Sequence, residues 1–385
     1  MAGYLGPIFD MDVHHYPLND QELLPYIPRE WRAYADEVIA YTPKSGREIL
    51  SLWNPPFHFQ NPLIAYEGID RLKFADVEPK HGKPYDQYIA DALDVYGDQG
   101  YGVALSFNVG QIGSFPNPHY AAAVATATND WNIDTWLSLG DDRLWSEVAI
   151  SEAIPDLAAA EIHRVGGHDR IRGVCLASNA LGRPTGDPLR DPIFKAAVEN
   201  DLAVSWHPFP SDRPNRQITH TGGMSGHVEY MALMGQALPN YVSSLIVNGT
   251  FEKFPDLRVV FRETGVLWLP AVIWKLDQMY EQLKGESPWV KKWPSEYIHE
   301  HMTFCTQPLE EAPDGPRLSG EVLGAVDWIE DVLCFSTDYP HAIAYDEAQW
   351  VAKHLPESWH RKVFVDNACD AYRIPRPPVE QPVAA

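Results

Sequence analysis

Two segments near opposite ends of the chain carry residue types that bind metals and move protons. The segment FDMDVHHYP places Asp12 and His14 two positions apart, so their side chains share one face if the segment is a strand. The segment FSTDYPHA places Asp338 just after the apolar run at 332–335, with His341 three residues later. That run is typical of a short buried strand. We therefore expect Asp338 at the carboxyl end of a strand, where α/β proteins bind ligands.

A second histidine is expected at the end of another strand. His207 follows the apolar run at 202–206 in LAVSWHPF, immediately before a proline. Together, His14, His207 and Asp338 would bring two imidazoles and a carboxylate to one face of the fold. This ligand set suits a divalent metal ion with an open coordination position, which would activate water. Capping of the strand before the proline is the alternative role for His207.

The remaining candidate residues have roles that the sequence leaves open. Asp12 is either a metal ligand or a partner that orients an imidazole. Glu263, at the end of the run DLRVVFRETG, is either catalytic or paired with Arg262 or Arg258. Asp338 could both bind the metal and transfer a proton, and His341 would orient the region around it. We take Asp338, Glu263 and His341 as catalytic candidates, and His14, His207, Asp338 and Asp12 as metal-ligand candidates.

Strand and helix patterns alternate along most of the chain. Each apolar strand-like run is followed by an amphipathic or alanine-rich segment of helical length. Eight strands with intervening helices are the pattern of a parallel (β/α)8 barrel. The expected strands cover 7–13, 102–109, 143–150, 171–178, 202–209, 256–265, 297–308 and 331–340. The expected helices cover 86–100, 117–139, 151–167, 191–202, 240–255, 266–286, 346–355 and 357–373.

The domain organisation follows from length and from proline content. A chain of 385 residues fits one barrel domain over 1–374 with a long insertion after the first strand, at about 18–84. That insertion is rich in proline and aromatic residues, and too long for an ordinary loop, so we expect short helices that form a lid or an interface. Residues 375–385 form a proline-rich tail.

Composition excludes several classes of partner. The chain has 30 Lys and Arg against 53 Asp and Glu, a formal net charge of −23, which disfavours nucleic acid and anionic membrane surfaces. Its four cysteines form no CxxC pair, which is typical of reduced thiols in a cytoplasmic protein. We expect no transmembrane helix and no secretory signal at the amino end. A small-molecule substrate is the expected partner.

Six segments taken in order resemble one family. They are DMDVHHYP, SWHPFP, NGTFEKFPDLRVVFRETGVLWLP, FCTQPLEEAP, FSTDYPH and DNACDAYRI, spread over about 7–374. They are similar to the amidohydrolase-related (amidohydrolase 2) family of the metal-dependent amidohydrolase superfamily, which includes aminocarboxymuconate semialdehyde decarboxylase. The resemblance implies a distorted (β/α)8 barrel, here with the long insertion after strand 1 that the sequence itself shows. It also implies a divalent metal, with zinc expected and iron or manganese as alternatives, and hydrolysis or nonoxidative decarboxylation of a small carboxylate or amide.

The resemblance places family ligands on His14, His207 and Asp338, but the match is uneven. The second histidine of the family's HxH pattern falls on Tyr16, and the strand-six histidine falls on Glu263. A second hypothesis follows, in which the chain resembles a subunit of a two-component metal-dependent monooxygenase of the 2-aminoisobutyrate hydroxylase type. In that case it would be the partner chain with an incomplete metal site. The assembly would be a homo-oligomer, or a hetero-oligomer with a related barrel subunit.

Overall fold

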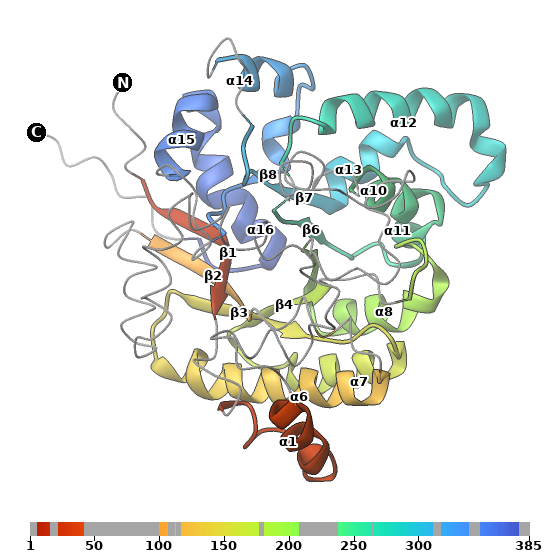
Figure 1. Cartoon of the computed structure of the whole chain (residues 1–385). Coiled ribbons are helices and arrows are strands. Elements are labelled where there is room, and N and C mark those ends of the chain that lie inside the picture. The colour runs from red at the N-terminus through yellow and green to blue at the C-terminus, as the bar shows by residue number, and fades with distance from the viewer. Residues whose placement is uncertain are drawn as a thin grey trace, which may run out of the picture.

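The computed structural model describes one parallel sheet of eight strands in the part of the chain it covers. The strand order follows the chain from β1 to β8 (Figure 1). The strands are β1 (Ile8–His15), β2 (Gly100–Ser106), β3 (Leu144–Ala149), β4 (Ile171–Leu176), β5 (Ala203–Trp206), β6 (Val259–Phe261), β7 (Met302–Cys305) and β8 (Leu333–Cys334). The described residues are 6–15, 22–41, 100–106, 112, 117–176, 181–207, 238–263, 265–310, 317–338 and 347–376.

The sheet closes on itself where its first and last strands meet. The backbone N–H of Met11 in β1 donates to the carbonyl of Phe335, just beyond β8, at 3.1 Å. The register of β1 against β2 shifts between Asp10 and Val13, and β8 contains only two residues, so the closed barrel is irregular. These features confirm the predicted distorted (β/α)8 barrel.

Helices follow the strands and pack around the outside of the barrel (Figure 1). The longest, α6, begins at Pro118 behind Asn117, whose side chain accepts hydrogen bonds from the backbone N–H groups of His119 and Tyr120. The α-helices are α1 (Arg32–Tyr41), α6 (Pro118–Thr135), α7 (Pro155–Val165), α8 (Asp191–Glu199), α10 (Leu238–Val247), α11 (Thr250–Lys253), α12 (Leu269–Leu283), α13 (Pro294–His301), α14 (Arg317–Leu323), α15 (Glu347–His354) and α16 (Asn367–Tyr372). Short 3-10 turns are η2 (Arg29–Trp31), η7 (Leu137–Leu139), η8 (Pro188–Arg190), η10 (Lys284–Glu286), η11 (Ile329–Asp331) and η12 (Glu357–Trp359), and η13 (Lys362–Asp366) is a π-helical turn.

Some expected elements differ in the structure. The strand expected at 297–308 is wrong in its first part, because α13 runs to His301 and β7 begins only at Met302. Pro294 occupies the first turn of α13, and the Glu296 carboxylate accepts from the backbone N–H of Trp293 at 2.7 Å, which favours a helix start there. The helix expected at 86–100 lies outside the described residues except for Gly100, which begins β2. Most of the insertion and most of the tail also lie outside them, and the division into barrel, insertion and tail stays a prediction.

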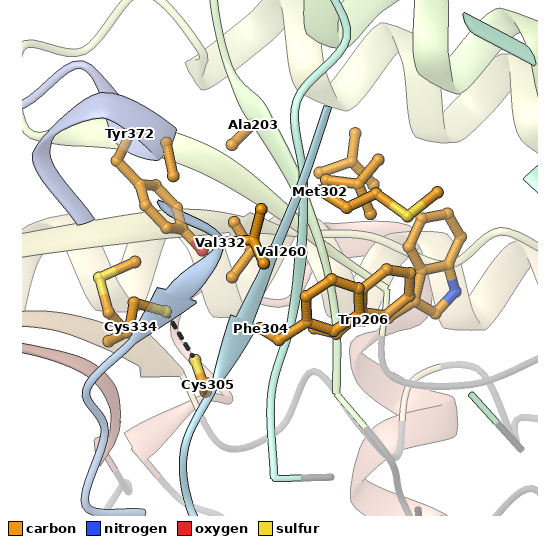
Figure 2. Packing of buried hydrophobic residues seen from close by; sticks show 14 of the residues in the cluster. Ala203, Trp206, Val260, Met302, Phe304, Cys305, Val332, Cys334 and Tyr372 are labelled. Atoms are coloured by element: carbon orange, nitrogen blue, oxygen red, sulfur yellow. Dashed lines mark hydrogen bonds between the residues drawn. The ribbon is translucent and has the colours of Figure 1, made fainter. Parts of the chain in front are cut away.

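The apolar core lies mainly between the strands and the surrounding helices. Figure 2 shows part of this packing, with Trp206 and Phe304 among the aromatic rings and with Cys305 facing Cys334. The two sulfur atoms are 3.4 Å apart on neighbouring strands, and all four cysteines of the chain are buried free thiols. Trp131, on α6, is 1% exposed and belongs to the core. None of the helices in the described segments combines the length and apolar character that a bilayer span requires.

The interior of the barrel holds a polar network next to the core. Glu147 of β3 accepts hydrogen bonds from Ser205 Oγ at 2.8 Å, Tyr372 OH at 2.6 Å and Arg262 Nη2 at 2.8 Å. Arg262 Nη2 also donates to Tyr372 OH. All four side chains are buried, and Tyr372 reaches the strands from α16 (Figure 2). Space for this network comes from Gly173 of β4.

We expect Gly173→Ala to destabilise the fold. A Cβ at Gly173 would lie 2.5 Å from Glu147 Oε1 and 2.9 Å from Tyr372 Cε1, so the buried network would have to shift. Overpacking of this kind costs about 1–3 kcal/mol of unfolding free energy. Urea denaturation would measure the loss. Gly167→Ala is the matched control, because no atom lies within 4 Å of its added Cβ. Equal stability of the two variants would contradict the prediction.

Candidate metal centre

β1 places Asp12 and His14 on the barrel interior, next to the end of β8. His14 Nε2 donates to Asp338 Oδ1 at 2.7 Å and lies 3.6 Å from Asp12 Oδ1. The His14 side chain is 4% exposed and that of Asp338 is 5% exposed. Residues 324 positions apart in the sequence therefore meet at the seam where the barrel closes, as expected for carboxyl ends of parallel strands.

His207, directly after β5, completes a compact group. Its Nε2 lies 3.5 Å from Asp12 Oδ2, and its ring meets the ring of His14 edge-on with centroids 5.0 Å apart. Asp12 thus lies between two imidazoles, instead of beside one. The structure brings together all four residues expected to act on a metal.

The donor set of this group fits a divalent metal ion. One ligand atom from each of Asp12, His14, His207 and Asp338 lies within 4.8 Å of all the others, and all four residues are buried. Two carboxylates held this close and away from water repel each other, and a bound cation would offset that repulsion. Imidazole and carboxylate donors suit zinc, iron and manganese. The prediction of a divalent metal cofactor is confirmed. The donor set does not distinguish zinc from iron or manganese.

Glu263 lies beside the group at the end of β6. Its Oε2 is 3.3 Å from His207 Nε2, and its backbone has a φ of 47°, in the left-handed region that non-glycine residues seldom adopt. Removal of the carboxyl from water, reinforced by the negative charges of Asp338 and Asp12, raises the pKa of Glu263 well above its usual range. Residues held in such a conformation cluster at functional sites, and Glu263 lies beside the candidate metal ligands.

Neither arginine that could have paired with Glu263 does so in the described structure. Arg262 Nη2 binds Glu147, and Arg262 Nη1 lies 3.7 Å from Asp12 Oδ1. Arg258 pairs with Asp201, with Nη1 and Oδ1 3.2 Å apart. The alternative of a structural salt bridge for Glu263 is therefore not what the structure shows. His341 and Tyr16 lie outside the described residues.

Asp10 is a buried acid next to the centre that sequence reasoning missed. It is 2% exposed and accepts hydrogen bonds from Thr337 and from the backbone of Asp12. Burial raises the pKa of the Asp10 carboxyl to about 7, against the opposing effect of these hydrogen bonds. A signal was present, because Asp10 has the same parity along β1 as Asp12 and His14.

The chain belongs to the amidohydrolase family Amidohydro_2, whose model matches residues 11–374. Among solved structures, it is similar to 5-carboxyvanillate decarboxylase from Sphingomonas paucimobilis, with 20% identity and a TM-score of 0.66 over 96% of this chain and 99% of that one. It is also similar to 2,6-dihydroxybenzoate decarboxylase from Rhizobium, with 16% identity and a TM-score of 0.60 over 96% and 99%.

A third similar structure contains a metal. It is the 5-carboxyvanillate decarboxylase of Novosphingobium aromaticivorans DSM 12444, complexed with manganese and 4-hydroxy-3-methoxy-5-nitrobenzoic acid, with 17% identity and a TM-score of 0.65 over 96% of each chain. At these identities the three structures establish the shared barrel. The predictions of the family, and of an enzyme of the amidohydrolase superfamily, are confirmed. These comparisons give no support to the monooxygenase alternative.

Proposed function

We propose that this chain is a metal-dependent nonoxidative decarboxylase that acts on a small aromatic carboxylate. The observation that carries the proposal is the buried group of Asp12, His14, His207 and Asp338 at the carboxyl ends of β1, β5 and β8. The similar structures support the reaction class, since all three are decarboxylases of hydroxylated benzoates, and one of them binds manganese with a nitrobenzoic acid. Hydrolysis of an amide at the same site is the alternative within the family.

The four residues have defined roles in the proposed site. Asp12, His14, His207 and Asp338 would hold the ion through one donor atom each. A bound divalent ion supplies Lewis-acid stabilisation of negative charge on substrate oxygen atoms. The carbon–carbon bond to the substrate carboxylate then breaks, carbon dioxide leaves, and the bonding electrons remain on the ring carbon, which takes up a proton. The protein must therefore deliver one proton to carbon.

Two acids of the chain are placed to deliver that proton. Glu263 lies 3.3 Å from His207, beside the donor group but outside it, so its carboxyl can face a bound substrate. Asp338 is the second candidate, because it is hydrogen-bonded to His14 and lies at the mouth of the barrel. His341 stays a predicted orienting residue. An oligomeric assembly and a cytoplasmic location also stay predictions.

A decarboxylation assay tests this function directly. Protein stripped with a chelator and reloaded with Mn²⁺ or Zn²⁺ is incubated with 5-carboxyvanillate or 2,6-dihydroxybenzoate, and released carbon dioxide and the phenolic product are quantified. We expect turnover that disappears on stripping and returns with the metal. Absence of carbon dioxide release from any hydroxylated benzoate by metal-loaded protein, together with amide hydrolysis, would overturn the decarboxylase in favour of the hydrolase.

A matched pair of variants tests the proton donor. Glu263→Gln keeps the size of the side chain and removes its acid, so kcat should fall about 100-fold or more, as is typical for loss of a general acid. Glu286→Gln, at an exposed position after α12, should leave kcat unchanged. An undiminished kcat in Glu263→Gln would assign the proton to another acid.

A further inference from the structure

Asp10 joins the two ends of the barrel seam through both of its carboxylate oxygens. Oδ2 accepts a hydrogen bond from Thr337 Oγ1 at 2.5 Å, and Oδ1 accepts from the backbone N–H of Thr337 at 3.0 Å. Oδ1 also accepts from the backbone N–H of Asp12 at 3.2 Å. Both carboxylate oxygens accept hydrogen bonds from other residues of the chain. Asp10 therefore links the segment after β8 to β1. We call the contact between these residues the Asp10–Thr337 clasp.

The clasp lies between the two segments that carry the metal-binding candidates. β1 carries Asp12 two residues after Asp10, and Asp338 follows Thr337 directly. The backbone N–H of Met11 donates to the carbonyl of Phe335 between the same two segments. The clasp therefore adds two side-chain hydrogen bonds across the seam, and a third within β1.

Asp338 has an uncommon backbone conformation. Its φ is 59°, in the left-handed region, which few residues other than glycine, asparagine and aspartate adopt, and contacts around it help to hold it there. Asp10 fixes both the N–H and the side chain of the residue immediately before it. The same carboxylate fixes the backbone N–H of Asp12. One buried group thus sets the backbone at two of the four metal-binding candidates.

We propose that Asp10 is a positioning residue for the metal centre, and that the Asp10–Thr337 clasp sets the separation of Asp12 from Asp338 and thereby the affinity for the metal. This inference rests on the proposed function, because it takes those two acids as ligands. Groups that orient metal ligands typically change metal affinity by about 10–100-fold when they are removed. The clasp acts on the backbone of the ligands, so its loss should leave the donor atoms present but wrongly spaced.

Titration of chelator-stripped protein with Mn²⁺ tests the proposal. Free Mn²⁺ is followed by its electron paramagnetic resonance signal, which gives a Kd without any assay of activity. We expect Asp10→Ala to raise the Kd about 10–100-fold, and Thr337→Val, which removes only the Oγ1 hydrogen bond, to raise it about tenfold. Asp10→Asn should stay within about threefold of the unmodified protein, since an amide can make the same contacts with Thr337 and Asp12.

A matched control separates positioning from general destabilisation. Thr128→Val makes the same change at a fully buried threonine of α6, away from the seam, and should leave the Kd unchanged. Circular dichroism and Tm establish that each variant is folded, and Thr337→Val remains informative if Asp10→Ala does not fold. Equal weakening by Thr128→Val and Thr337→Val would overturn the proposal.

The proposed function can fail separately from the clasp. If His207→Ala abolishes Mn²⁺ binding while Asp10→Ala and Thr337→Val bind it like the unmodified protein, the clasp is purely structural and the metal centre stands. If His207→Ala also binds Mn²⁺ fully, the ligand assignment itself is wrong and the positioning role is lost with it.

Discussion

Protein carrying His207→Ala, or Asp338→Ala, should lose its bound divalent metal and keep its fold. Each substitution removes one of four donor atoms that lie within 4.8 Å of one another. Loss of a group that only orients a ligand costs about 10–100-fold in metal affinity, so loss of a ligand should cost more than about 100-fold. The backbone N–H of His207 donates to the Leu176 carbonyl at 3.0 Å, and alanine keeps that bond, so the strand ladder should survive the change.

Elemental analysis of purified protein by plasma mass spectrometry measures this loss. Asp338→Asn accompanies Asp338→Ala, because asparagine tolerates the left-handed backbone that Asp338 adopts and so separates ligand loss from backbone strain. The control is the surface pair His299 and Asp331, whose Nε2 and Oδ2 atoms are 3.2 Å apart. Alanine at either control position should leave the metal content unchanged. Full metal retention in both His207→Ala and Asp338→Ala would refute the assignment.

The strand ends were predictable because the barrel imposes one rule on all of them. An apolar run followed by a polar residue locates the carboxyl end of a parallel strand, and all such ends meet on one face. That rule placed His207 and Asp338 on the same face, and the period of two along β1 placed Asp12 beside His14. These two sequence patterns were therefore enough to predict that the four residues meet, without knowledge of any individual contact.

The partners of the buried acids could not be predicted, because many donors compete for each carboxylate. Asp10 meets Thr337 across 327 residues, and Glu147 meets Tyr372 across 225. Nothing in the local sequence of either partner distinguishes it from other threonines and tyrosines. Glu147 itself gave a usable signal, since an acid inside the apolar strand LWSEVA must find a buried partner.

The error before β7 has a local cause. The segment YIHEHMTFC is rich in aromatic and branched residues, which favour strands when read alone. In the structure, Tyr297 and Ile298 are buried on α13, so tertiary packing decides the conformation. The proline and glutamate at 294 and 296 were the sequence features that pointed to a helix start.

Arg262→Met should be among the most destabilising single substitutions in the barrel. The Arg262 and Glu147 side chains are both fully buried, and Nη2 lies 2.8 Å from Oε1. Removing the guanidinium leaves the Glu147 carboxylate without its cation and removes a donor to Tyr372 OH. Breaking a buried pair by deleting one partner typically costs about 3–5 kcal/mol. Urea denaturation of chelator-stripped protein measures this cost separately from metal binding.

Two further variants show whether the cost arises from the unpaired charge or from lost packing. Adding Glu147→Gln to Arg262→Met removes the uncompensated carboxylate, so the double variant should be more stable than Arg262→Met alone if charge is the cause. Arg183→Met breaks an exposed pair, with Nη1 3.4 Å from Asp187 Oδ2, and should cost less than about 1 kcal/mol. If the double variant is less stable than Arg262→Met, the loss of stability arises from lost packing. The remaining hydrogen bonds from Ser205 and Tyr372 would then be sufficient to hold the buried Glu147 carboxylate.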